Sequence, residues 1–279
     1  MRTFVDCYPC FLRQALEICN FLGADEVKKK DVLNKTMDIM QNLDLHLSPP
    51  EIALQIQSMI KQTFDINDPY AKVKAQSTRR ALKLYPQLKN MVEQSEDKLE
   101  AAIKISIAGN IIDFGPSSHF DIEATVDEVF TQELPVFDIG LFRIALSKAK
   151  KILYLADNAG ETVFDRVLIE TLPKHVLYAV KSGPVINDAT RTDAEAAGIN
   201  QVAKIIETGS DAAGTILSRC SKRFLEIYTK ADLVIAKGQA NLETLSDEGP
   251  RVFFLLKVKC LVISEHFNLP YKGTILKRG

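Results

Sequence analysis

Apolar residues recur at helical spacing over the first part of the chain. From Cys7 to about Ile107 they mostly lie three or four positions apart, as on one face of an α-helix. One helix start is marked by Ser48, which precedes two prolines and a glutamate, and another by Pro69. The next helical run is expected to break at Pro86. We therefore predict a multihelical region without strands.

From residue 151 onward the pattern changes to short apolar runs separated by helical segments. Buried strands are predicted over 151–156, 175–180, 203–207, 232–236 and 252–256. Helices are predicted between them, over 162–172, 190–197 and 212–228, with a short one near Leu242. Strands that alternate with helices are typical of a parallel sheet covered on both faces, so the fold class is α/β. We place a multihelical domain at 1–125 and an α/β domain at 126–279, with the boundary between Gly115 and Pro135.

Composition and charge exclude several classes of protein. The chain is 46% apolar and 25% charged, as expected of an ordinary globular protein rather than a disordered or fibrous one. Its formal net charge of -1 presents no field for nucleic acid or for an anionic membrane, and neither is expected as a partner. The only basic run, Lys28 to Lys30, is interpreted as a solvated helix end.

The ends of the chain and its cysteines favour a reducing compartment. The residues after Met1 lack the apolar core of a signal peptide. The apolar stretch from Val252 to Ile263 is interrupted by lysines and is too short to cross a bilayer. Five cysteines are an odd count, which favours free thiols. We expect a cytoplasmic protein.

Polar and glycine-flanked residues follow every predicted strand. Ligands of an open parallel sheet bind outside the carboxyl ends of its strands, because loops and helix N-termini converge there. The segments concerned are 157–161, 181–188, 208–211, 237–241 and 257–260. Any one of these polar residues could simply cap a helix. Independent caps, however, need not share lysines and glycines at one edge, so we expect one site.

Oxygen ligands in these segments indicate a divalent cation. Asp157, Asn158 and Asp188 supply two carboxylates and an amide, which suit a hard or borderline ion such as magnesium or manganese. Such an ion keeps positions open for water and for a substrate oxygen. These three residues are therefore the candidate metal ligands, with Asp157 and Asn158 also counted as catalytic.

Positive charge and flexible backbone beside these ligands indicate phosphate chemistry. Lys181 and Lys237 offer charge, while Gly183 and Gly238 let the backbone approach an anion closely. A metal with lysines and exposed N–H groups is an arrangement that stabilises a transferring phosphoryl group. We count Asn241, after the fourth predicted strand, in the same phosphate-binding set.

Several common nucleotide and phosphatase motifs do not occur. The sequence contains no phosphate-binding P-loop motif, and no glycine fingerprint of the dinucleotide type follows the first strand. An aspartyl-phosphatase of the haloacid dehalogenase type would need an acid two residues after its nucleophile, where this chain has Ala159. We therefore expect a metal-activated water as the nucleophile.

Five motifs in order resemble a known family, and together they cover nearly the whole chain. Segments 109–115, 157–161 and 237–241 look like signatures of the damage-control phosphatases, metal-dependent enzymes long catalogued as a domain of unknown function. The N-terminal Cys7-Tyr8-Pro9-Cys10 and the closing Lys257-Val258-Lys259-Cys260 are similar to the compact archaeal and bacterial branch.

The resemblance implies a fold, an activity and a set of residues. It implies a multihelical domain packed on a Rossmann-like three-layer α/β domain, in agreement with the pattern above. It implies hydrolysis of phosphomonoesters of small metabolites, such as sugar phosphates or damaged metabolites, with magnesium, manganese, cobalt or nickel. By resemblance, the metal ligands are Asp157, Asn158 and Asp188, the phosphate contact is Lys237, and Asn110 and Asp113 reach the site from the helical side.

Some roles stay open at this level. Asn187 or Asp193 competes with Asp188 as the third ligand. Glu161 is the candidate general base, with orientation of its loop as the alternative. The pair Cys7 and Cys10 is half of a zinc site without a second half, so packing, metal binding and redox sensitivity all remain open.

Two other functions compete with the phosphatase hypothesis. One is a transferase, of the adenosyl-methionine type, that uses the same sheet edge. The missing glycine fingerprint argues against it. The other is a non-enzymatic sensor of a metal or a phosphorylated metabolite, with Cys7 and Cys10 reporting redox state.

Overall fold

The structure is a computed structural model that describes residues 1–111, 128–130 and 133–279. The longer helices are α1 (Tyr8–Phe21), α2 (Glu26–Gln41), α3 (Pro49–Phe64), α4 (Ala71–Gln94), α5 (Lys98–Ile111), α7 (Ile139–Lys148), α8 (Thr162–Thr171), α9 (Arg191–Ala196), α10 (Lys222–Thr229), α11 (Gln239–Leu245) and α12 (Leu261–His266). The strands are β1 (Val136–Phe137), β2 (Ile152–Leu155), β3 (Val176–Val180), β4 (Lys204–Glu207), β5 (Leu233–Lys237), β6 (Val252–Lys257) and β7 (Thr274–Arg278).

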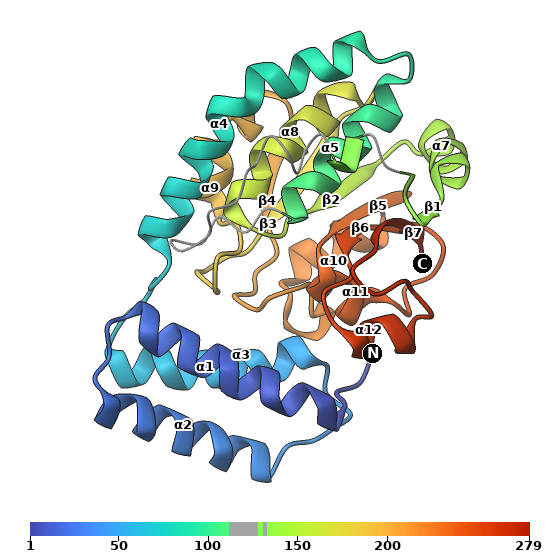
Figure 1. The fold of residues 1–279 in the computed structure, drawn as a ribbon. Helices are drawn as coiled ribbons and strands as arrows, with labels where there is room; N and C mark the ends of the chain where they lie inside the picture. Colours follow the sequence, from blue (N-terminus) through green and yellow to red (C-terminus); the bar gives the residue numbers. More distant parts are fainter. Residues whose placement is uncertain (112–127, 131–132) are drawn as a thin grey trace.

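Helices α1, α2 and α3 pack on one another around a core of their own. Residues such as Phe11, Val32 and Ile56 are buried together there. The start of α3 follows the expected motif, because Ser48 and Glu51 form a reciprocal capping box. These helices form a layer below the carboxyl ends of the strands, and the N-terminus of the chain lies beside α12 (Figure 1). As predicted, residues 1–111 contain no strand.

Helix α4 differs from the sequence expectation at Pro86. The proline lies inside the helix, which continues to Gln94. A proline removes one backbone hydrogen bond, but the apolar face that continues past it, with Ala81, Leu88 and Val92, packs into the main core. Tertiary burial therefore carries the helix through a residue that would end an isolated one.

The sheet has seven strands in the order β1-β7-β6-β5-β2-β3-β4. Strands β2 to β6 pair in parallel, whereas β7 runs antiparallel to β6 and pairs in parallel with β1. All five predicted strands are confirmed, each to within one residue at either end. Strands β1 and β7 were not predicted, since β1 is two residues long and β7 has only two apolar residues, Ile275 and Leu276.

Successive residues of the central strands point into two different cores. Ile152 and Tyr154 of β2 lie in a core shared with α4, α5, α7 and α8. Leu153 and Leu155 lie in a second core, shared with α10, α11 and α12. Helices therefore cover both faces of the sheet, as Figure 1 shows, and the α/β three-layer prediction is confirmed.

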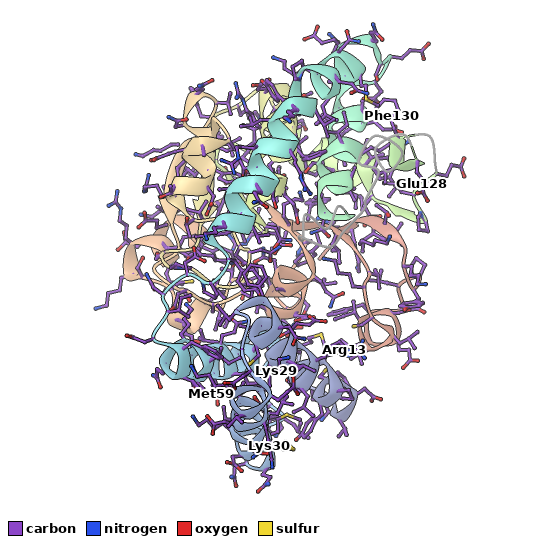
Figure 2. All side chains as sticks on the ribbon, turned by 60° about the vertical axis from the view of Figure 1, so that its left-hand side comes forward. Arg13, Lys29, Lys30, Met59, Glu128 and Phe130 are labelled. Atoms are coloured by element: carbon purple, nitrogen blue, oxygen red, sulfur yellow. The ribbon has the colours of Figure 1, made fainter. Side chains whose placement is uncertain are left out.

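Helices α4 and α5 belong to the sheet's packing, although they precede it in sequence. Both contribute to the same core as α8 and the strands. The proposed boundary at residue 125 lies outside the described residues and stays a prediction. The basic run at Lys29 and Lys30 lies on α2, at the end of the molecule opposite to Glu128 and Phe130 (Figure 2).

The predicted helix 212–228 is wrong in its first half. Residues up to Ile216 form a loop, a short 3-10 turn covers Leu217–Arg219, and α10 begins only at Lys222. Gly214 in this loop has a positive φ of 67°, and Ser221 caps α10 by accepting from the Phe224 N–H. The loop thus reaches the carboxyl edge of the sheet before the helix starts. None of the described helices is long and apolar enough to cross a membrane.

Candidate metal and phosphate site

Two loops meet at the carboxyl edge, after β2 and β3, and bring the predicted metal ligands together. The Ala159 N–H donates to the Asn187 oxygen at 2.8 Å, and the Ala189 N–H donates to the Asp157 oxygen at 2.8 Å. Asn158 and Asp188 pair across these loops in an isolated antiparallel bridge. Side chains that are 30 residues apart in sequence therefore share one end of the sheet.

The structure separates Asp188 from its competitor Asp193. Asp193 caps α9, and its Oδ2 accepts from the Thr190 N–H at 2.9 Å, from Thr190 Oγ1 at 2.6 Å and from Lys74 Nζ at 3.2 Å. Its carboxylate is therefore committed to structure. Asp188 lines the same cavity as Asp157 and Asn158, and so does Asn187.

Three buried carboxylates face one another at this edge. Burial raises the pKa of Asp157 well above its usual range, and the negative charges of Glu161 and Asp188 raise it further. Burial raises the pKa of Asp188 to about 6, with the Lys181 ammonium acting in the opposite direction. Carboxylates held close together out of water call for positive charge between them.

The donor set fits a divalent cation. Asp188 Oδ2 is buried and has no hydrogen-bond partner among the described residues, although Lys181 Nζ lies 3.6 Å away. Two carboxylates and an amide oxygen are ligands that magnesium and manganese accept. No cluster of three or more His, Cys, Asp or Glu in the described part of the chain has the arrangement of a metal site.

Gly238 lets the end of β5 lie directly against Asp157. Its φ is 82°, and a Cβ at this position would lie 2.0 Å from Asp157 Oδ2. Any side chain there would displace the carboxylate. The contact with Asp157 was not predicted from the sequence, and the expected approach of this backbone to a bound anion stays a prediction.

Glu161 lies behind the ligands rather than in the cavity. It is 1% exposed, and its Oε1 accepts from Asn158 Nδ2 at 2.7 Å and from Asn110 Nδ2 at 2.9 Å. The same Asn110 nitrogen donates to Asp157 Oδ2 at 3.0 Å, and Asn110 Oδ1 accepts from the Lys257 N–H at 3.1 Å. Asn110 therefore ties α5 to the loops at the carboxyl edge.

The close packing of α5 on α8 delivers Asn110. A Cβ at Gly109 would come within 2.9 Å of the Phe164 side chain, so only glycine allows the two helices to approach this closely. The neighbouring candidate Asp113 lies outside the described residues.

The other predicted phosphate ligands are held by the protein itself. Lys181 Nζ donates to the Gly214 oxygen, and Asn241 Oδ1 accepts from Thr215 Oγ1 at 2.8 Å while its Nδ2 donates to the Lys237 oxygen at 2.7 Å. Lys237 is fully buried against Asp165 and Glu161. The described residues that line the cavity do not include Lys181, Lys237 or Asn241, nor do they include Gly183.

A cavity of about 530 Å³ opens in front of Asp157, Asn158 and Asp188. That volume suits a small metabolite. The cavity residues Lys259, Gln239 and Glu243 were not among the site residues predicted from the sequence. The signal for Lys259 was present, because it lies in the motif that follows β6. Its charge acts on Asp157 and lowers the pKa of that carboxyl, against the effect of burial.

Cysteines from both ends of the chain line the same cavity. Cys7 directly precedes α1, Cys10 lies in the first turn of that helix, and Cys260 lies in the loop after β6. Cys10 is exposed, whereas burial raises the pKa of Cys7 and of Cys260. Because Cys10 and Cys260 are 250 positions apart, their sequence spacing could not predict that they line one cavity.

The chain is similar to proteins of archaea and plants over most of its length. The model of the damage-control phosphatase ARMT1-like domain matches residues 3–272. A damage-control phosphatase of Pyrococcus horikoshii is 31% identical, with 99% of this chain and 97% of the relative aligned. One of Archaeoglobus fulgidus is 30% identical, with 97% of each aligned. An uncharacterized protein of Methanocaldococcus jannaschii is 33% identical over 97% of this chain and 93% of its own.

A solved structure has the same fold. The crystal structure of a DUF89 family protein from Pyrococcus horikoshii superposes with a TM-score of 0.92, at 31% identity, and the match covers 100% of this chain and 99% of that one. The match of the domain model to nearly the whole chain, with relatives at 30% identity or more, shows the family. The chain belongs to the damage-control phosphatases with an ARMT1-like domain, which supports a role as a phosphatase.

Proposed function

We propose that this protein is a metal-dependent phosphatase that hydrolyses phosphomonoesters of small metabolites. One observation carries the metal dependence: the buried carboxylates of Asp157 and Asp188 line one edge of a metabolite-sized cavity with that of Glu161 behind them, and Asp188 Oδ2 has no hydrogen-bond partner among the described residues. Without a cation this arrangement is unfavourable. Relatives from Pyrococcus horikoshii and Archaeoglobus fulgidus are named damage-control phosphatases, which supports the phosphatase activity.

Asp157, Asn158 and Asp188 would hold the cation. When bound, a divalent ion would stabilise negative charge on the phosphoryl oxygens and make an attacking water more acidic. The carboxylates of Asp157 and Asp188 supply the negative charge that binds it, and Gly238 leaves room for Asp157 to reach it. Asn187, which also lines the cavity, stays an alternative source of an oxygen ligand.

Lys259 would bind the phosphate group of the substrate. Among the described residues it is the lysine that lines the cavity, and its side chain is exposed. Its backbone N–H donates to Gln239 Oε1 at 3.0 Å, which fixes the loop that carries it. A lysine acts on a phosphoryl group as a point charge, and a flexible, solvated side chain suits that task.

Glu161 would orient the site rather than abstract a proton. A general base must come within hydrogen-bond reach of the attacking water. Glu161 is buried behind Asn158, and one of its oxygens is occupied by two amide groups. The loop-orienting alternative for Glu161 is therefore the one that we adopt.

The test is phosphate release from p-nitrophenyl phosphate by chelator-treated protein. Magnesium, manganese, cobalt or nickel is restored singly, and Asp157→Ala is assayed beside the wild type. We expect turnover that depends on the metal and is lost in the variant, with the variant still folded by circular dichroism. Absence of turnover with every metal, while metals still raise the Tm of the wild type, would contradict the enzyme and favour the sensor hypothesis.

A further inference from the structure

A cluster of buried charges lies directly beneath the proposed metal site. Lys237, at the end of β5, has no exposed surface. Its Nζ lies 2.6 Å from Asp165 Oδ1, 2.8 Å from the Ser106 oxygen and 3.2 Å from Glu161 Oε2. An ammonium group has three donors. Two of them are used in hydrogen bonds to Asp165 and Ser106, and Glu161 Oε2 lies at ion-pair distance without a hydrogen bond. Lys237 is therefore held inside the protein and does not reach the cavity.

Asp165 anchors this lysine through a full set of partners. Besides Lys237, its Oδ1 accepts from Tyr154 OH at 2.7 Å and from Ser106 Oγ at 3.1 Å, and its Oδ2 accepts from Tyr178 OH at 2.7 Å. The two tyrosines stand on neighbouring strands, β2 and β3, and are fully buried. The rigid sheet therefore fixes Asp165, and Asp165 fixes Lys237.

Glu161 is the next member of the chain of contacts. Its Oε2 is buried, and among the described residues the Lys237 ammonium is the group that faces it. Its Oε1 accepts from the amide nitrogens of Asn158 and Asn110. An ionised carboxylate is acceptor-only, so it requires the NH₂ side of each amide. The oxygen of Asn158 is thereby turned away from Glu161.

The stability of the fold alone does not explain why the buried Asp165–Lys237 ion pair is present. A buried ion pair is costly to desolvate, and well-packed apolar side chains of the same size are often equally or more stable. Asp165 and Lys237 are 0% exposed, and the tyrosines that donate to Asp165 belong to the main apolar core. Because Lys237 contacts Glu161, the pair can hold Glu161 in position beside the candidate metal ligands.

We propose that the Asp165–Lys237 pair is a positioning device that holds Glu161, and through it the Asn158 amide, in the orientation that binds the metal. This inference rests on the proposed function and deepens it. Lys237 thereby acts on the metal ligands and leaves contact with phosphate to Lys259. Outer-shell partners of this kind typically change metal affinity about 10–100-fold when they are removed.

The test compares two lysine-to-methionine variants. Manganese affinity is measured by calorimetry on chelator-treated protein, which needs no turnover, and KM and kcat are measured separately. For Lys237→Met we expect manganese affinity about 10–100-fold lower, with KM at saturating manganese unchanged. For Lys259→Met we expect the reverse, a higher KM and a change in manganese affinity much smaller than that in Lys237→Met. Wild-type manganese affinity in Lys237→Met, together with a higher KM, would overturn the proposal and restore Lys237 as a phosphate ligand.

A double variant covers the case in which Lys237→Met does not fold. Asp165→Asn with Lys237→Met removes both buried charges and so avoids leaving one of them unpaired. The positioning role requires manganese affinity to stay low in this variant, because Glu161 still lacks its cation, even where the Tm is restored. Manganese affinity equal to that of the wild type would show the pair to be structural. If the wild type binds manganese without turnover, the proposed function fails while the positioning test remains valid.

Discussion

Gly238 is packed against Asp157 so closely that a Cβ on the glycine would lie 2.0 Å from Asp157 Oδ2. The backbone at the end of β5 thus forms one wall of the site at the end of β2, its neighbour in the sheet. This contact makes the position of a candidate metal ligand depend on the absence of a side chain at the end of a strand that comes three strands later in sequence.

Gly238→Ala should therefore displace Asp157. We expect kcat/KM to fall about 100-fold or more, since a shift of about 1 Å in a catalytic group has an effect of this size. The matched control is Gly249→Ala, because Gly249 also has a positive φ, of 79°, but its added Cβ would meet nothing within 4 Å. Both variants carry the backbone strain, about 1–3 kcal/mol. Equal activities of the two variants would show that the Asp157 contact has no role.

Asp188→Asn and Asp193→Asn should have opposite effects on stability and on metal binding. The first removes a buried charge that faces two other carboxylates, so the Tm of the metal-free protein should rise while manganese affinity falls more than about tenfold. The second breaks the cap of α9 and its contact with Lys74, which should cost about 1–3 kcal/mol of unfolding free energy and leave manganese affinity unchanged. Thermal melts with and without manganese measure both quantities. Loss of the manganese response in Asp193→Asn alone would reassign the ligand.

Glu243 should make the folded state less stable as pH rises. Burial raises the pKa of this carboxyl from 4.5 to about 7, against the lowering effects of the Gln239 amide and the amino group of Met1. Between these two values the folded protein holds a proton that the unfolded chain has lost, so the free energy of unfolding falls as pH increases and then levels above about 7. At 1.36 kcal/mol per pKa unit the change is at most about 3 kcal/mol.

Glu243→Gln tests this by removing the titration while keeping an oxygen that accepts from Gln239 Nε2. We expect the variant to be more stable than the wild type at pH 8 and nearly equal to it at pH 4.5, as measured by urea denaturation at both values. A constant difference across this range would mean that Glu243 is already ionised in the folded protein at low pH.

Alkylation of Cys10 should inhibit the enzyme by filling the cavity. Cys10 is exposed and lines the cavity, whereas Cys19 is buried in the core of α1–α3. We expect N-ethylmaleimide to modify Cys10 ahead of Cys19, as followed by mass spectrometry of peptides, with activity lost in parallel. Cys10→Ser should keep its activity and resist inactivation at the same reagent concentration. Rapid inactivation of Cys10→Ser would contradict this prediction and indicate that modification of Cys7 or Cys260 causes the loss of activity.

The secondary structure of the α/β region could be predicted closely because its strands are buried on both faces. Continuous apolar runs such as Leu153 to Leu155 mark such strands without any tertiary information. The error at Pro86 has the opposite origin, since packing of the α4 face outweighed a local helix breaker. The half-exposed strand β7 carries a weaker signal and was missed.

The sequence predicted which polar residues lie at the strand ends, but it did not predict the role of each one in the candidate site. Asp157, Asn158 and Asp188 do lie at one edge, as the parallel topology requires. Lys237 and Lys259 both follow strands, and sequence spacing does not distinguish a lysine that turns into the core from one that turns into the cavity.

Sequence by itself thus determined the fold class and the edge where the polar residues gather. Hydrophobic periodicity is a local property of the chain, and strands that alternate with helices form a parallel sheet whose carboxyl ends share one edge. Only the tertiary structure decided which polar groups face the cavity and which are used up inside the protein. The physical reason is that a buried donor or acceptor must find its partner, and those partners come from distant parts of the chain. Asn110 on α5, Lys237 on β5 and Asp165 on α8 show how far apart such partners lie in sequence.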